Sequence, residues 1–175
     1  MKQVAMRPQD VVILLKKISP SGWNMSGKQL AESVGISQSE VSDSLARSRV
    51  SGLLDASGKV NTLALKDFLV YGLKYVFPVV PAGIVRGIPT GISASPIKEK
   101  ISQGTESFVW PYAKGTLRGQ AVQPLYPSIP AAVEGDIDFY TLMVMADVLR
   151  FGRVREREIA IELLDKYFLN YVKQQ

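Results

Sequence analysis

The sequence contains no cysteine and no histidine. Without cysteine there can be no disulfide, no thiolate nucleophile and no cysteine-ligated zinc site. Without histidine the chain lacks the usual general base, the Ser-His-Asp triad and the commonest transition-metal ligand. An enzyme of this composition would depend on carboxylates, lysine, tyrosine or arginine. We therefore expect a protein that is not an enzyme and that has no cofactor and no metal ion.

The sequence also has no apolar run long enough to span a bilayer, and its amino terminus lacks the regions of a secretory signal. We expect a cytoplasmic location and no membrane partner. The net charge is +5, and residues 1–76 hold most of that excess, with ten lysines and arginines against six acids. An excess of positive charge in the amino-terminal part is expected when the partner carries negatively charged phosphates.

Two helix starts stand close together in the amino-terminal part. Ser26 is followed by Gln29 and Ser37 by Glu40, and both pairs fit the capping box. They predict helices over about residues 27–34 and 38–48. Gly35 lies between them, where a sharp turn requires a residue that accepts positive φ. The expected inner faces are formed by Leu30, Ala31 and Val34 in the first helix and by Val41 and Leu45 in the second.

The pattern of Ala31, Gly35, Val41 and Leu45 resembles the helix-turn-helix of winged-helix transcription regulators, most closely the MarR-like group, over about residues 8–76. This resemblance implies that the helix 38–48 lies in the major groove of double-stranded DNA. Carried over by position, the implied DNA-contacting residues are Gln38, Ser39, Ser42, Asp43 and Arg47. Asp43 departs from the family pattern, since an acid repels phosphate unless it accepts from a cytosine amino group.

Other elements complete the expected winged helix. The pattern predicts a first helix over 8–18, a strand over 52–55, a turn over 56–59, a returning strand over 60–62 and a further helix over 63–76. The strand pair would be a short wing with Lys59 at its tip, either touching a phosphate or remaining solvated. Lys28 would add to a positive face shared with Gln38, Arg47 and Lys59.

Residues 77–130 hold eight of the ten prolines, so no long helix can persist there. Short strands are expected over 107–110 and 115–122, with a turn at Lys114. The glycine-rich stretch 83–97 lacks the ending of a phosphate-binding loop, and we reject that interpretation. Apolar spacing then predicts helices over 137–151 and 153–172, separated by Gly152 and paired as an antiparallel hairpin.

The nearest approach to a carboxylate cluster is formed by Asp136, Asp138 and Asp147, for which helix capping is favoured over metal binding. The expected fold is α+β, with a winged helix-turn-helix domain over 1–76. A carboxy-terminal α+β domain over 77–175 would dimerise, receive a signal or bind a protein partner. The leading hypothesis is a sequence-specific DNA-binding regulator that acts as a homodimer on a two-fold site. The alternative is a protein-interaction adaptor or antitoxin-like protein whose winged helix packs or autoregulates.

Overall fold

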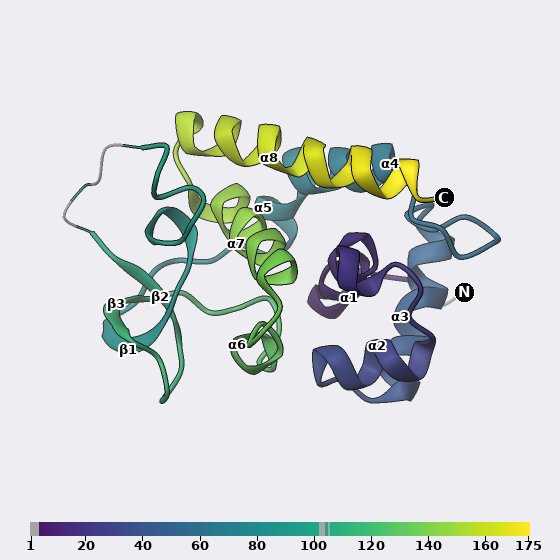
Figure 1. The fold of residues 1–175 in the computed structure, drawn as a ribbon, viewed down its shortest axis with the longest axis horizontal. Helices are drawn as coiled ribbons and strands as arrows, with labels where there is room; N and C mark the ends of the chain where they lie inside the picture. Colours follow the sequence, from purple (N-terminus) through teal and green to yellow (C-terminus); the bar gives the residue numbers. More distant parts are fainter. Residues whose placement is uncertain (1–3, 102–103, 105) are drawn as a thin grey trace.

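The computed structural model describes residues 4–101, 104 and 106–175, and helix α1 (Pro8–Ile18) is enclosed by other helices in it. The fold is mixed α+β, and other helices surround α1 while a small sheet lies at one end of the molecule (Figure 1). Residues 11–15 of α1 are all 0% exposed. A helix that is apolar on every side needs partners on every side. Helices α2 and α3 supply them on one side, and α7 and α8 supply them on others.

Helices α2 (Gly27–Val34) and α3 (Gln38–Val50) begin where the capping pattern predicts. Ser26 Oγ accepts from the main-chain N–H of Gln29 at 3.3 Å, and Ser37 Oγ accepts from that of Glu40 at 3.2 Å. Gly35 has a φ of 66° and turns the chain between the two helices, as expected. Helix α3 extends two residues beyond its predicted end.

The predicted wing is much reduced. A single bridge between Leu54 and Val60 replaces the expected strand pair, and Thr62 belongs to α4 (Thr62–Asp67). The predicted pairing is present only as this bridge, and longer strands do not form because side chains organise this segment locally. Asp55 accepts from Ser57 Oγ and from the main-chain N–H of Lys59, which closes the turn. Asn61 caps α4 directly after the bridge by accepting from the N–H of Ala64.

Helix α4 continues through a π-helical turn (Phe68–Gly72) into α5 (Leu73–Val76), in the position predicted for one helix. A 3₁₀ turn at Pro20–Gly22 follows α1, and another at Gly91–Ser93 follows the first strand. Farther along the chain, α6 (Ile129–Ala132) is a single short turn of helix.

Three short strands form the sheet: β1 (Ile84–Pro89), β2 (Phe108–Pro111) and β3 (Leu117–Ala121). β1 pairs antiparallel with both other strands, and β2 pairs parallel with β3, so the sheet closes on itself. Gly87 faces both Pro111 and Leu117 at the point of closure. A Cβ atom on Gly87 would lie 1.9 Å from the carbonyl oxygen of Trp110, so only glycine fits there. The two predicted strands are confirmed in position.

Helices α7 (Ile137–Phe151) and α8 (Val154–Lys173) confirm the predicted hairpin. The hydroxyl of Tyr167, late in α8, donates to Asp138 at the start of α7 at 2.8 Å, which fixes the antiparallel arrangement. Helix α8 then reaches the amino-terminal part, where Tyr171 Oη accepts from the main-chain N–H of Val60 at 3.0 Å. One cluster of buried apolar side chains therefore crosses the expected boundary at residue 76. Within the described ranges, no helix combines the length and apolar character needed to cross a membrane.

Candidate nucleic-acid interface

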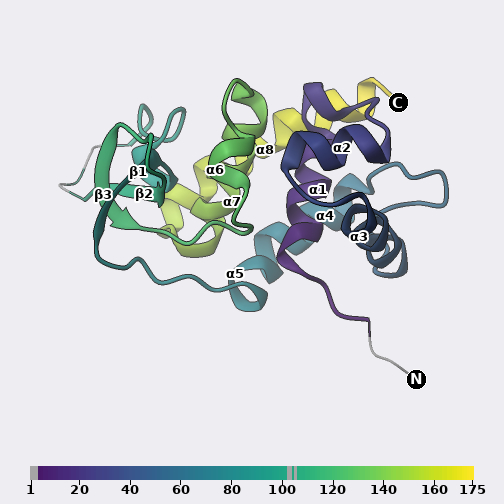
Figure 2. The ribbon, with the colours of Figure 1, turned by 90° about the horizontal axis from the view of Figure 1, so that it is seen from below.

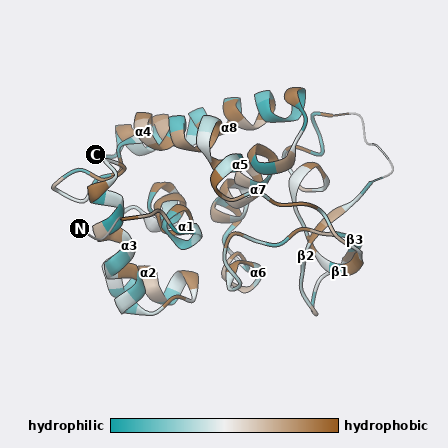
Figure 3. Cartoon of the chain, turned by 180° about the vertical axis from the view of Figure 1, so that it is seen from behind, coloured by the Kyte–Doolittle hydropathy of each residue, from teal (hydrophilic) through white to brown (hydrophobic). Residues whose placement is uncertain are grey.

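One face of α3 is exposed along the length of the helix. Four of the predicted DNA-contacting residues lie on this outward face, together with residues that the sequence did not single out. The exposed set comprises Gln38, Ser39, Ser42, Asp43, Ala46, Arg49 and Val50. Val41, Ser44 and Ser48 on the opposite face are buried toward the core. Figure 3 shows the resulting hydrophilic colouring along α2 and α3.

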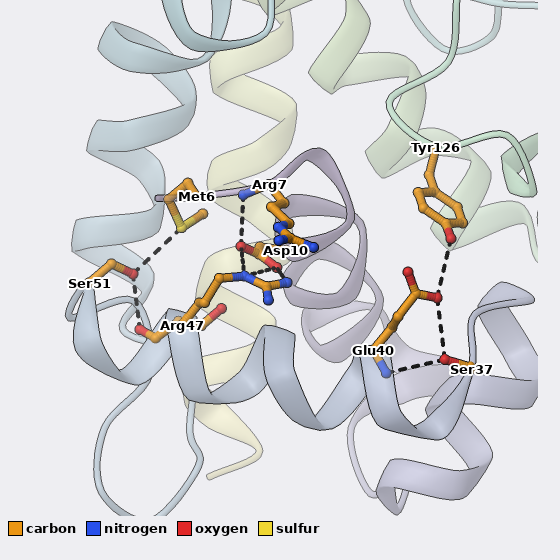
Figure 4. A network of polar contacts seen from close by, with 9 residues as sticks. Met6, Arg7, Asp10, Ser37, Glu40, Arg47, Ser51 and Tyr126 are labelled. Carbon is orange, nitrogen blue, oxygen red and sulfur yellow. Dashed lines mark hydrogen bonds and ion pairs between the residues drawn. The ribbon is translucent and has the colours of Figure 1, made fainter. Parts of the chain in front are cut away.

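Arg47 does not share this exposure. Its guanidinium donates three hydrogen bonds to the carboxylate of Asp10 in α1, from Nη2 to Oδ1 at 2.6 Å and from Nε to Oδ2 at 2.9 Å and to Oδ1 at 3.2 Å (Figure 4). The Asp10 side chain is 0% exposed and that of Arg47 only 15%. The hydrogen bond to Asp10 raises the pKa of Arg47 above its ordinary value. In this arrangement Arg47 is a positioning residue that fixes α3 against the central helix.

Asp10 is a residue that the sequence reasoning missed. It also accepts from the main-chain N–H of Arg7 at 2.8 Å, and so caps the start of α1. A single acid within the otherwise apolar run of residues 10–15 was the available signal. Nothing in the sequence marked Arg47, which is 37 residues away, as its partner.

Glu40 links the start of α3 to the carboxy-terminal half of the chain. Its carboxylate accepts from Ser37 Oγ at 3.3 Å and from the hydroxyl of Tyr126 at 3.5 Å (Figure 4). Ser128, two residues farther on, donates its hydroxyl to the carbonyl oxygen of Val34 at the end of α2. The segment before α6 therefore supports both helices at their turn, on the side away from the outward face of α3.

The predicted lysines lie apart from one another. Lys28 is exposed on α2, and its Nζ is 4.0 Å from Glu32. Lys59 follows the turn beyond α3, and its Nζ is 3.3 Å from the carbonyl oxygen of Gln175. The outward face of α3 itself carries one acid, Asp43, and one base, Arg49. Arg49 is seven residues beyond Ser42, a spacing that places both on the same side of a helix and could have identified it.

The three carboxylates that the sequence grouped have separate partners. Asp136 caps α7, accepting from the N–H of Phe139 at 3.0 Å, and forms an ion pair with Lys16. Asp147 is buried and accepts from Trp110 Nε1 at 2.6 Å and from Arg150. No group of three or more potential metal ligands occurs within residues 4–101, 104 and 106–175.

Comparisons with protein-family models, with curated proteins and with solved structures find no match to this chain.

Proposed function

We propose that the chain is a sequence-specific regulator that binds double-stranded DNA through the outward face of α3, with the amino-terminal half acting as a winged helix-turn-helix. The observation that carries the proposal is the row of exposed polar side chains on a helix that is fixed from behind by the Arg47–Asp10 pair. A helix of 13 residues is about 20 Å long, and the major groove, about 12 Å wide, admits one helix.

The side chains on this face have the chemistry of base and phosphate recognition. Gln38 presents an amide that can pair with adenine through two hydrogen bonds, and Ser39 and Ser42 present hydroxyls for phosphate or base edges. Arg49, which is exposed where Arg47 is not, would bind a phosphate. Asp43 would accept from a cytosine amino group. A module of this size contacts few base pairs, so two copies on a two-fold site are part of the proposal.

A protein partner is the second candidate, and the charge of α3 favours it. With Arg47 held by Asp10, the outward face has no net positive charge, so little affinity would come from counterion release. The single-bridge wing also offers little surface to a minor groove. In this second candidate function, the outward face of α3 contacts a protein, and the chain is an adaptor or antitoxin-like protein.

Fluorescence anisotropy with duplex DNA from upstream of the protein's own gene, at two salt concentrations, distinguishes the two functions. We expect binding that weakens with salt, and a loss of about one unit of salt slope in Arg49→Ala. Gln38→Ala is expected to relax the sequence preference. Arg155→Ala, which removes an exposed arginine at the start of α8, is the matched control and should bind like the wild type. Absence of binding at low salt, or equal losses in Arg49→Ala and Arg155→Ala, would overturn the DNA-binding proposal.

A further inference from the structure

Two arginines stand directly opposite each other on the small sheet. Arg86 in β1 and Arg118 in β3 are partners in the antiparallel register, and both are exposed. The Cβ atoms of such a pair are about 4.5 to 5.5 Å apart, so the two side chains leave the sheet side by side. Like charges in this position destabilise a strand pair. The strand pair forms despite this repulsion.

One acid lies near this pair: Glu106, two residues before β2, stands where the parallel β2–β3 register continues beside Arg118. Among the residues that the structure describes, none of the ion pairs within 4.0 Å involves Arg86 or Arg118. The strands and the turn between β2 and β3, residues 84–89 and 108–121, contain three bases and no carboxylate. Glu134 approaches this region but accepts a hydrogen bond from Tyr112 Oη at 2.8 Å.

The third base is Lys114, which is exposed in the turn between β2 and β3. The next residue, Gly115, packs so closely on β1 that a Cβ atom there would lie 2.2 Å from the main chain of Gly87. Gly87 directly follows Arg86. This close approach holds the turn that carries Lys114 against the strand that carries Arg86, within the closed sheet.

We propose that Arg86 and Arg118 together bind a phosphate group, with Lys114 as a third cation beside them. Guanidinium groups donate paired hydrogen bonds that match phosphate oxygens, and two adjacent positive charges suit a dianion. A bound phosphate would replace the repulsion between the two arginines with attraction. The group could belong to a small phosphate ester or to the backbone of a nucleic acid, since both offer the same oxygens.

This site is separate from the outward face of α3. The sheet and α3 lie at opposite ends of the molecule, with α6 and α7 between them (Figures 1 and 2). The inference goes beyond the proposed function and does not rest on it.

Thermal unfolding of the full chain tests the site, with sodium phosphate or pyrophosphate compared with sodium chloride at equal ionic strength. We expect phosphate to raise the unfolding midpoint of the wild type by about 2 to 4 °C more than that of Arg86→Gln or Arg118→Gln. Arg155→Gln, an exposed arginine outside the sheet, should respond like the wild type and reports the general salt effect. Without phosphate, Arg118→Gln should be at least as stable as the wild type, because it relieves the repulsion.

A short single-stranded oligonucleotide added to the same series identifies the source of the phosphate. Stabilisation by pyrophosphate indicates a small phosphate ester, and stabilisation by the oligonucleotide alone indicates a nucleic-acid backbone. Equal responses of the wild type and both arginine variants to every phosphate compound would overturn the proposal. Arg49→Ala should keep the phosphate response, so failure of DNA binding at α3 and failure of this site are told apart.

Discussion

Arg47 Nη2 in α3 lies 2.6 Å from Asp10 Oδ1 in α1, and this contact joins the exposed helix of the candidate interface to the most buried helix of the fold. The carboxylate is fully buried, so the arginine neutralises a charge that has no access to water. Together with the buried inner face of α3, this pair fixes the orientation of the helix against α1.

Arg47→Ala should therefore lower the free energy of unfolding by about 3 to 5 kcal/mol, because it leaves the Asp10 carboxylate buried without a partner. Urea unfolding measures the loss. Arg49→Ala, on the exposed side of the same helix, should change stability by no more than about 0.5 kcal/mol. The double variant Asp10→Leu/Arg47→Met should be more stable than Arg47→Ala. A loss below about 1 kcal/mol in Arg47→Ala would contradict the structural role of the pair.

Two serines on the inner side of α3 give a prediction of opposite sign. The hydroxyls of Ser44 and Ser48 are buried and have no hydrogen-bond partner. Replacing either with alanine removes an unsatisfied polar group, so stability should stay the same or rise by about 1 kcal/mol. Ser37→Ala, which removes the cap of the same helix, should instead cost about 1 kcal/mol. Chemical unfolding of the three variants checks the contrast, and a marked loss in Ser44→Ala would show that its hydroxyl is satisfied.

The turn between α2 and α3 should be sensitive to a single methyl group. Gly35 has a φ of 66°, and a Cβ atom there would approach Ser128 Cβ to 3.0 Å. We expect Gly35→Ala to destabilise the fold by about 1 to 2 kcal/mol through backbone strain and crowding. Gly27→Ala places its methyl group in open space and serves as the control. Differential scanning calorimetry of both variants suffices, and equal midpoints would argue against the left-handed turn.

Acid should weaken the connection between α1 and α7. Burial acts to raise the pKa of Asp136, but hydrogen bonds from Lys16, Ser21 and the N–H of Phe139 outweigh it and hold the pKa below its usual value. A carboxyl whose pKa is lower in the folded state stabilises the fold above its unfolded pKa of about 3.9, and this stabilisation is lost as the pH falls through the folded value.

The stability difference between the wild type and Asp136→Asn should therefore be largest near neutral pH and shrink below about pH 4. The measurement is the urea midpoint of both proteins from about pH 2.5 to about pH 7, a range that lies on both sides of the unfolded pKa. Asp67→Asn, at an exposed carboxylate outside the ion pairs of the described residues, is the control. A difference that grows on acidification would contradict the sign of the pKa shift.

The sequence predicted those parts of the fold that short-range chemistry determines. Ser26, Ser37, Gly35 and Gly152 mark helix ends through contacts within a few residues, and the helices they bound lie where expected. The closed sheet was not predicted, because Gly87 meets strands that begin more than 20 residues later in the chain. The ion pair between Arg47 and Asp10 was missed for the same reason, because its two residues lie on different helices that are far apart in the sequence. The assignment of the outward face of α3 to DNA stays a prediction.

The closure of the sheet has a consequence for how the protein behaves in concentrated solution. Each of the three strands pairs with both others, so no strand has a side that is left unpaired along its whole length. Open strand edges are templates for pairing with other chains and a common origin of aggregation. Helix α7 adds to this protection, because its Asp147 and Tyr140 contact Trp110, and Val109 and Trp110 are both fully buried.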